Sequence, residues 1–330
     1  MSQKPKTACI VGAGAIGGWI GAGLSRAGCT VSMLARGATL AALQANGLQL
    51  IHADGRTETH AVRASASAQE LGPHDLVVVA VKTPAMREVA QHIAPLLGPK
   101  SVLLCAMNGV PWWFLSGFGG DLQDHPLTTI DPDGAIAGAI ATRQVIGAVV
   151  HASCSVAAPG VVQHGFGKKI IVGEPAGAPG EPVLALAGVL QRAGFETVVS
   201  HQIQRDIWFK LWGNMTMNPV SAMTGATTHQ VLNDDLVRGF CSAVMCEARD
   251  IGARLGLEID QQPEDRHAVT RKLGAFKTSM LQDVEAGRAV ELDALVGAVR
   301  ELGQLTGVAT PFTDALLGLS RLHAQVRGLY

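Results

Sequence analysis

The 330-residue sequence has little charge, few aromatic side chains and a single tyrosine. Charged residues make up 16% and the formal net charge is −1, so the dense basic patch typical of nucleic-acid-binding proteins is missing. No apolar run approaches the roughly 18 residues that a membrane helix needs, and glycines interrupt the apolar stretch that follows the N-terminal lysines. We therefore expect a cytoplasmic protein with no nucleic-acid or membrane partner.

Cysteines are few, and their spacing does not suggest a disulfide framework. None of the six belongs to a Cys-x-x-Cys motif, and four lie inside apolar runs, which is typical of reduced core thiols. We assign no metal site. Hydrophobic residues make up 48% of the chain, and glycines number 39. Such a composition predicts a folded protein of about two domains with many tight turns.

In the first half, short β-rich runs alternate with helical patterns, which is typical of a parallel sheet with helices on its faces. We expect helices near 15–27 and 84–97, and an antiparallel excursion over 48–51 and 57–64, around an Asp-Gly turn. The strands are expected at 7–11, 29–34, 76–81, 101–106, 145–150 and 194–200.

The second half carries apolar residues at helical spacing. Stripes of this kind cover 236–255, 266–286, 291–306 and 311–326. We therefore predict an α/β protein, with a Rossmann-type doubly wound domain over residues 1–200 and an all-α domain over 201–330. The turn-rich segment 173–182 is expected to be a linker inside the first domain.

A glycine-rich segment, Gly12-Ala13-Gly14-Ala15-Ile16-Gly17, directly follows the first strand and opens a helix. In this context the first glycine makes a turn, the second lets the backbone approach a pyrophosphate, and the third packs helix on strand. The N–H groups of the helix N-terminus favour the anion. The segment predicts a dinucleotide site, although a glycine-rich turn without a ligand is the simpler alternative.

Polar side chains follow three further strands. Arg36 comes after the second strand, where an NAD site would carry an acidic residue, and its charge matches the 2′-phosphate of NADPH. Lys82 and Asn108-Gly109 follow the next two strands. Because ligands bind at the carboxyl ends of parallel strands, all three are candidate cofactor residues. Alternatively, Arg36 and Lys82 are solvated and Asn108 belongs only to a turn.

Lys210 lies among large apolar residues in a predicted helix, and Asn214 and Asn218 follow it at intervals of four. This spacing stacks the three polar side chains on one face before Pro219, which restricts the continuation of the helix. An ammonium flanked by carboxamides suits a carbonyl substrate, since it can give up a proton. Taken alone, a lysine whose stem covers apolar surface is the more ordinary explanation.

Together, these residues resemble the ketopantoate reductase family, and the resemblance covers nearly the whole chain. Besides the glycine segment, it rests on Lys82, Asn108-Gly109, Lys210-Leu211-x-x-Asn214-x-x-x-Asn218-Pro219, Ser279-Met-Leu-Gln-Asp283 and Glu291-x-Asp293. The resemblance implies NADPH-dependent reduction of 2-dehydropantoate to pantoate, in a cleft between the two domains.

The resemblance also implies a role for each residue. Lys210 would donate the proton to the forming alkoxide, and Glu291 would orient Lys210 and touch the cofactor ribose. Asn108 would bridge cofactor and substrate. Asn214, Asn218 and Ser279 would hold the hydroxyl and carboxylate of the substrate.

The sequence departs from the family at several points that affect the substrate. Met107 replaces a frequent glutamine, and Trp112 and Trp113 follow it closely, either lining a bulkier pocket or packing locally. The long stretch 112–146 is expected to form a lid or the arm of a homodimer. A reductase of another 2-oxo acid and a non-catalytic NADPH sensor therefore remain as alternatives.

Overall fold

The computed structural model describes residues 5–272 and 274–330, and these divide into two compact units. The first unit comprises the chain up to Met107 together with Gly134–Ile203, and the second comprises Asn108–Asp133 and Gln204–Tyr330. The chain passes between the units three times, and the expected boundary near residue 200 lies close to the third passage, after Ile203. The segment 108–133, however, packs with the helical unit, although the expected boundary placed it in the first domain.

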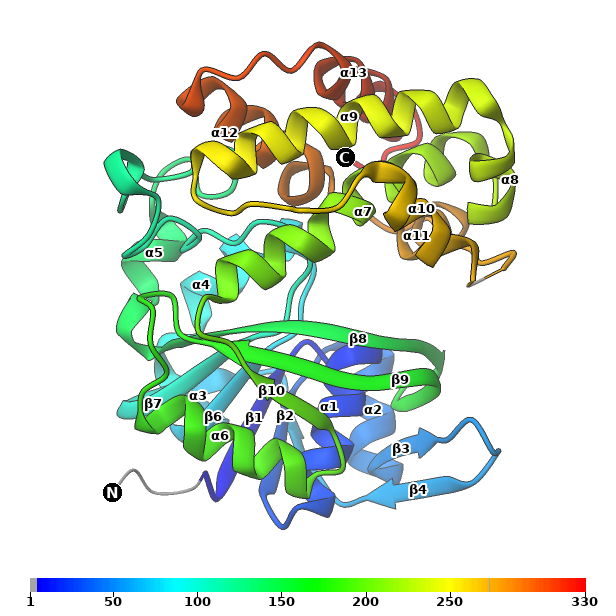
Figure 1. Cartoon of the computed structure of the whole chain (residues 1–330). Coiled ribbons are helices and arrows are strands. Elements are labelled where there is room, and N and C mark those ends of the chain that lie inside the picture. The colour runs from blue at the N-terminus through cyan, green and yellow to red at the C-terminus, as the bar shows by residue number, and fades with distance from the viewer. Residues whose placement is uncertain (1–4, 273) are drawn as a thin grey trace. The chain divides into compact units, whose positions relative to one another are not determined.

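One sheet organises the first unit, and the described residues contribute ten strands to it (Figure 1). The order is β4-β3-β9-β8-β7-β6-β1-β2-β5, with β10 paired to β9. The pairs β3–β4 and β8–β9 are antiparallel, and the remaining pairs are parallel. The strands are β1 (Thr7–Val11), β2 (Thr30–Leu34), β3 (Leu48–Ile51), β4 (Thr57–His60), β5 (Arg63–Ser65), β6 (His74–Val79), β7 (Leu97–Cys105), β8 (Val145–Ala158), β9 (Val161–Gly173) and β10 (Glu196–Val199).

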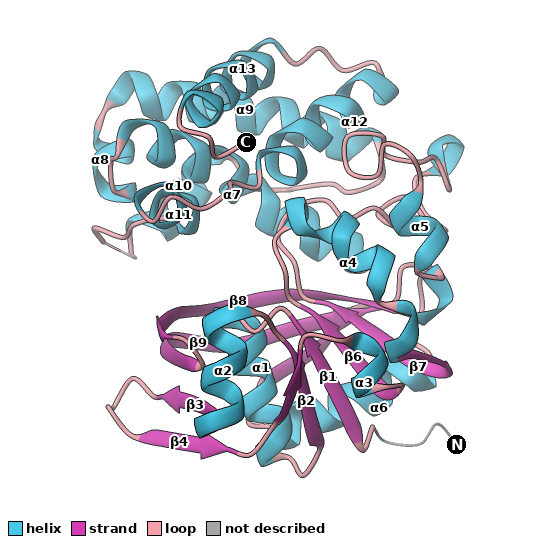
Figure 2. Cartoon of the chain, turned by 180° about the vertical axis from the view of Figure 1, so that it is seen from behind, coloured by secondary structure: helices cyan, strands magenta, loops and turns pink. Residues whose placement is uncertain are grey.

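Helices cover this sheet, and its central strands are buried on both faces (Figure 2). In β1, Ala8 and Ile10 join the core beneath α1 and α6, and Cys9, which alternates to the other face, is equally inaccessible. Strands buried in this way are typical of a sheet between helical layers. The α-helices of the first unit are α1 (Ala15–Arg26), α2 (Gly37–Asn46), α3 (Ala68–Leu71), α4 (Met86–His92), α5 (Ala135–Ala139) and α6 (Glu181–Arg192).

Two predictions for the sheet need correction. The run 57–64 forms two strands, because β4 pairs with β3 whereas β5 pairs in parallel with β2. The strand predicted at 145–150 is longer and forms a hairpin with β9, which the sequence did not predict. The far half of that hairpin is exposed on both faces, so it lacks the alternation of a half-buried strand.

The second unit is helical. Its longest helix, α7, continues through Pro219, contrary to expectation, because buried side chains on several sides hold it, among them Trp208, Trp212 and Val220. The stripe at 266–286 forms two helices rather than one. The helices are α7 (Ile203–Thr224), α8 (Thr228–Asn233), α9 (Asp235–Arg254), α10 (Pro263–Arg271), α11 (Ser279–Glu285), α12 (Ala298–Thr306) and α13 (Pro311–Val326), with a π-helical turn at Asp293–Gly297 before α12. Among the described residues, no helix combines the length and apolar character needed to cross a membrane.

Candidate active site

Glycines shape the loop between β1 and α1. Gly12 has a φ of +100°, and a Cβ there would lie 2.7 Å from the carbonyl oxygen of Ala80. A Cβ on Gly17 would lie 2.0 Å from the carbonyl oxygen of Gly12, so the fold itself requires both glycines. A Cβ on Gly14, by contrast, would have no atom of the described residues within 4 Å, apart from its own chain neighbours. The packing of the chain does not require this middle glycine, which is consistent with a ligand approaching the backbone here.

The N-terminus of α1 can receive an anion. Its N-cap residue is Gly14, no side chain caps the helix, and its first turn contains no acidic residue. The first backbone N–H groups of a helix lack partners within the helix, and the helix dipole makes this end positive. Ala13, Ala15 and Ile16 therefore lie where the motif predicts a pyrophosphate.

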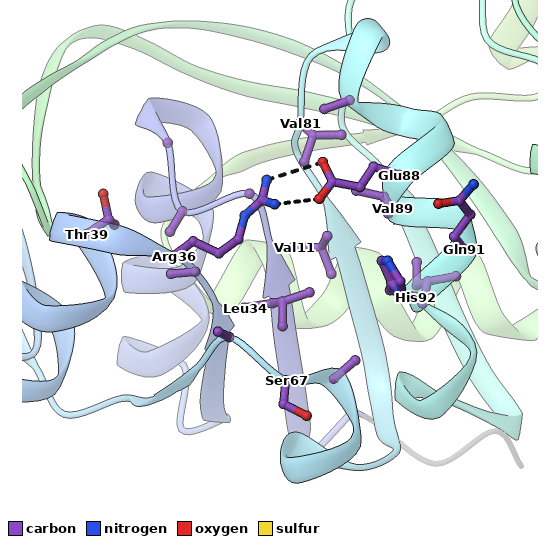
Figure 3. Close-up of a pocket in the computed structure, with 18 of the residues that line it drawn as sticks. Val11, Leu34, Arg36, Thr39, Ser67, Val81, Glu88, Val89, Gln91 and His92 are labelled. Carbon is purple, nitrogen blue, oxygen red and sulfur yellow. Dashed lines mark hydrogen bonds and ion pairs between the residues drawn. The ribbon is translucent and has the colours of Figure 1, made fainter.

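A cavity of about 800 Å³ lies beside this loop in the first unit (Figure 3). Its wall includes Gly12–Gly14 from the loop, Leu34–Arg36 at the end of β2, and residues of α3 and α4. The carboxyl ends of β1 and β2 thus open onto one space, as expected for a ligand site in an open α/β sheet. Lys82 lies at the N-cap of the short 3₁₀ helix Thr83–Ala85, and the cavity wall contains its neighbours Val81 and Ala85 rather than Lys82 itself.

Arg36 forms an ion pair across this cavity with Glu88, which the sequence did not single out. Two hydrogen bonds of 2.5 and 3.3 Å join the side chains, which point toward one another in Figure 3. Both side chains are exposed, Arg36 by 72% and Glu88 by 50%, so the pair is held loosely. Glu88 lies in the first turn of α4, where an acidic residue ordinarily interacts with the helix dipole, so no local pattern indicates its contact with Arg36.

In the second unit, the Nζ of Lys210 donates a hydrogen bond of 2.8 Å to the Oδ1 of Asn108. The two residues are 102 positions apart in the sequence, and Lys210 is half-buried on α7. Burial lowers the pKa of Lys210 to about 8, although the nearby charge of Glu291 raises it and that of Arg266 lowers it further. The structure therefore places Asn108 and the charges of Glu291 and Arg266 around Lys210.

The position of Asn108 depends on the glycine that follows it. Gly109 has a φ of +82°, and a Cβ there would lie 2.6 Å from the carbonyl oxygen of Ala294. The next residue, Val110, donates its N–H to that same oxygen at 2.9 Å. Ala294 lies three residues after Glu291, in the π-helical turn. This close approach ties the Asn108 turn to the segment that carries the glutamate.

The remaining predicted substrate residues differ in their surroundings. Asn214 and Asn218 follow Lys210 along the helical face of α7, and Asn218 is buried. Ser279 is exposed at the start of α11, after the N-cap Thr278, and no described hydrogen bond joins it to the lysine. In the part of the chain that the structure describes, no group of three His, Cys, Asp or Glu side chains could hold a metal ion.

The tryptophan pair lies inside the second unit. Trp112 is 7% exposed and Trp113 is 1% exposed, and the following Phe114 packs 5.9 Å from the ring of Trp208. Further along, the carboxylate of Glu301 accepts hydrogen bonds from the backbone N–H groups of Thr128 and Thr129. These contacts anchor the segment within its own unit and favour local packing as the role of the tryptophans.

Two family models match the chain. The model "Ketopantoate reductase PanE/ApbA" matches residues 8–115, and the model "Ketopantoate reductase PanE/ApbA C terminal" matches residues 202–324. Together they cover more than half of the sequence. The first model covers the glycine loop, Arg36 and Asn108, and the second covers Lys210.

Similar proteins extend over nearly the full length. A 2-dehydropantoate 2-reductase from Mesorhizobium japonicum is 45% identical over 97% of this chain and 98% of its own. A structure from Ralstonia solanacearum, assigned to the ketopantoate reductases, is 56% identical with a TM-score of 0.95, covering 98% of this chain and 99% of its own. A D-mandelate dehydrogenase in complex with NADH, 20% identical over 98% of this chain and all of its own, has a TM-score of 0.82 and shares the fold alone. The chain belongs to the ketopantoate reductase family.

Proposed function

We propose that this protein reduces 2-dehydropantoate to pantoate with NADPH, and that Lys210 supplies the proton. The contact between the Lys210 ammonium and Asn108 carries this proposal, because it presents a half-buried proton donor beside neutral groups that can orient a carbonyl. The 45% identical relative from Mesorhizobium japonicum is named for this reaction.

The residues of the first unit fit a nicotinamide dinucleotide. The glycine loop and the start of α1 would hold its pyrophosphate, and Arg36 would bind the 2′-phosphate that distinguishes NADPH from NADH. Glu88 must release Arg36 for this to happen, so it competes with the phosphate. When bound, the nicotinamide supplies the hydride for C2 of the keto acid.

The residues of the second unit fit the other half of the reaction. A ketone that receives a hydride becomes an alkoxide, which needs a proton and a nearby positive charge. With a pKa of about 8, the Lys210 ammonium is protonated at neutral pH yet gives up its proton more readily than an ordinary lysine. Asn108 fixes the ammonium by its hydrogen bond, and the negative charge of Glu291 favours reprotonation of the lysine.

The roles of Asn214, Asn218 and Ser279 toward the substrate remain proposals. The two asparagines lie on the same helix as Lys210, and within the described residues no side-chain hydrogen bond occupies either carboxamide. Both are therefore available to a substrate hydroxyl. Ser279, at the exposed start of α11, would have to reach the same molecule from another helix. The expected homodimer also stays a prediction.

The test is the oxidation of NADPH at 340 nm by the purified protein, with 2-dehydropantoate compared against a panel of 2-oxo acids that includes aromatic ones. We expect the highest kcat/KM with 2-dehydropantoate. A higher value with a bulkier acid would support the alternative of a different 2-oxo acid. Tight NADPH binding with no turnover of any acid would support the sensor alternative and contradict the proposal.

A further inference from the structure

Arg266 on α10 is partly buried, and no described carboxylate pairs with its positive charge. The Nε atom of its guanidinium is buried without a hydrogen-bond acceptor. Within residues 5–272 and 274–330, no carboxylate forms an ion pair with it, and burial lowers the pKa of this arginine. A guanidinium that is partly withdrawn from water is stabilised by an anion, because the charge loses part of its hydration. Its surroundings therefore suggest that an anion is supplied from outside the chain.

The structure makes room for this guanidinium against α7. A Cβ at Gly213 would lie 2.6 Å from the Nε and 3.2 Å from the Nη2 of Arg266. One turn earlier on the same helix, the ring of Phe209 lies 5.4 Å from the guanidinium carbon, a cation–π contact. A glycine inside a helix makes that helix less stable than an alanine would. At position 213 this loss of stability accompanies the close approach of the Arg266 guanidinium, for which a larger residue would leave no room.

The guanidinium lies near the proposed proton donor. Its charge acts on the Lys210 ammonium, which lies one residue after Phe209, and Asn214 directly follows Gly213. Lys210 on α7 has the charge of Glu291 nearby, whereas Arg266, which packs against α7 from α10, forms no ion pair with a described carboxylate. An anionic ligand would balance this second positive charge. In a 2-oxo acid the carboxylate carbon is bonded directly to the ketone carbon. A group that binds the carboxylate must therefore lie close to the group that protonates the ketone.

We infer that Arg266 binds the carboxylate of the 2-oxo acid whose ketone Lys210 protonates. This inference rests on the proposed function and adds a specificity-determining residue to it. The planar guanidinium fork matches a carboxylate with two parallel hydrogen bonds, which a lysine or a serine hydroxyl cannot provide. The site thereby selects 2-oxo acids over neutral ketones and amides of similar shape.

The experiment compares the preferred 2-oxo acid with its neutral primary amide, at saturating NADPH, in wild type and in Arg266→Gln. We expect the KM for the acid to rise by about 10- to 100-fold, as for the loss of a charge-assisted hydrogen-bond pair. The KM for the amide should stay within about twofold. Arg271→Gln is the matched control, since Arg271 lies on the same helix but pairs with Glu264 at the surface, and it should change neither value.

Two further variants separate binding from folding. Gly213→Ala should displace the guanidinium and raise the KM for the acid while Arg266 is retained, and Arg266→Lys should recover only part of the loss. Equal losses for acid and amide would show a structural role and overturn the inference. An unchanged KM for the acid in Arg266→Gln would overturn it as well.

A binding measurement distinguishes this inference from the proposed function. Trp208 and Trp212 on α7 provide intrinsic fluorescence, and titration with the 2-oxo acid gives a Kd that does not depend on turnover. If wild type binds the acid without reducing it, and Arg266→Gln weakens that binding at least tenfold, the carboxylate site stands and the proposed function fails. If wild type reduces the acid and Arg266→Gln binds it as tightly, only the carboxylate site fails.

Discussion

The two candidate sites of this protein differ in the groups that form them, which are backbone groups in one unit and side chains in the other. In the first unit, the site consists mainly of backbone, with a helix N-terminus without a side-chain cap and two glycines, Gly12 and Gly17, that leave no room for a Cβ. In the second unit, the site consists of half-buried side chains brought together from distant parts of the sequence. A backbone site is encoded by a few consecutive residues, whereas a side-chain site depends on the packing of the whole unit.

This contrast predicts opposite responses to mutation. Removing a side chain from the second unit should abolish chemistry and leave cofactor binding intact. Adding a methyl group to the glycine loop of the first unit, at Gly14, should weaken cofactor binding and leave Lys210 and its neighbours in place.

The largest effect is expected from Lys210→Ala. Without the proton donor, kcat should fall by roughly 10²- to 10⁴-fold, the usual contribution of general acid catalysis. The Kd for NADPH, measured by fluorescence titration, should stay nearly unchanged. Wild-type turnover in this variant would show that Lys210 is not the proton donor. The second unit would then not hold the chemical groups that the comparison of the two sites assigns to it.

The next largest effects separate two glycines of the same loop. Gly12→Ala places a side chain at a φ of +100° and against Ala80, so the free energy of unfolding should fall by about 1–3 kcal/mol. Gly14→Ala should leave the melting temperature unchanged, because its Cβ meets no described atom, yet weaken NADPH binding about tenfold by obstructing the pyrophosphate. Equal NADPH affinity in Gly14→Ala and wild type would argue against a pyrophosphate at this loop.

An effect of similar size is expected at Arg36, and a smaller one at its partner Glu88. Arg36→Asp should reduce the preference for NADPH over NADH by about 10- to 100-fold, measured as the ratio of the two kcat/KM values. Glu88→Gln should tighten NADPH binding by at most about fivefold, because exposed ion pairs contribute only about 0–1 kcal/mol. An unchanged preference in Arg36→Asp would contradict the assignment of the 2′-phosphate site.

The smallest effect concerns stability. The pKa of Lys210 is lowered from 10.5 to about 8 in the folded protein, so the unfolded chain binds more protons between these two values. The contribution of this group to stability therefore rises with pH from about 8 to about 10.5, and its ammonium destabilises the fold at pH 7. Lys210→Met should have a melting temperature at pH 7 equal to or above that of wild type. A clear decrease would show that the lysine stabilises the second unit.

The sequence predicted the fold class and the backbone site because their determinants are local. The strand at Thr7–Val11 and the glycine segment after it can be recognised within about a dozen residues. The strand Val161–Gly173 escaped prediction because glycines interrupt it and much of it is exposed on both faces. The assignment of 108–133 to the helical unit depends on contacts such as Thr128 with Glu301, which no local pattern reveals.

For the side-chain site, the residue patterns singled out Asn108 and Lys210 separately, and only the family resemblance joined them with Glu291 as a set. Arg266 and Glu88 lie outside that resemblance. Each occupies an ordinary position on an amphipathic helix, and only the packing of α10 on Gly213, or of α4 beside Arg36, shows what it faces.

The central claim, proton donation by Lys210, is tested most directly by the pH dependence of kcat with saturating NADPH and 2-dehydropantoate. With a pKa of about 8 in the folded protein, the lysine is a proton donor below that value and loses its proton above it. We predict that kcat is constant near pH 6–7 and falls about tenfold per pH unit well above pH 8. A kcat that stays constant from pH 7 to pH 10 would contradict the account.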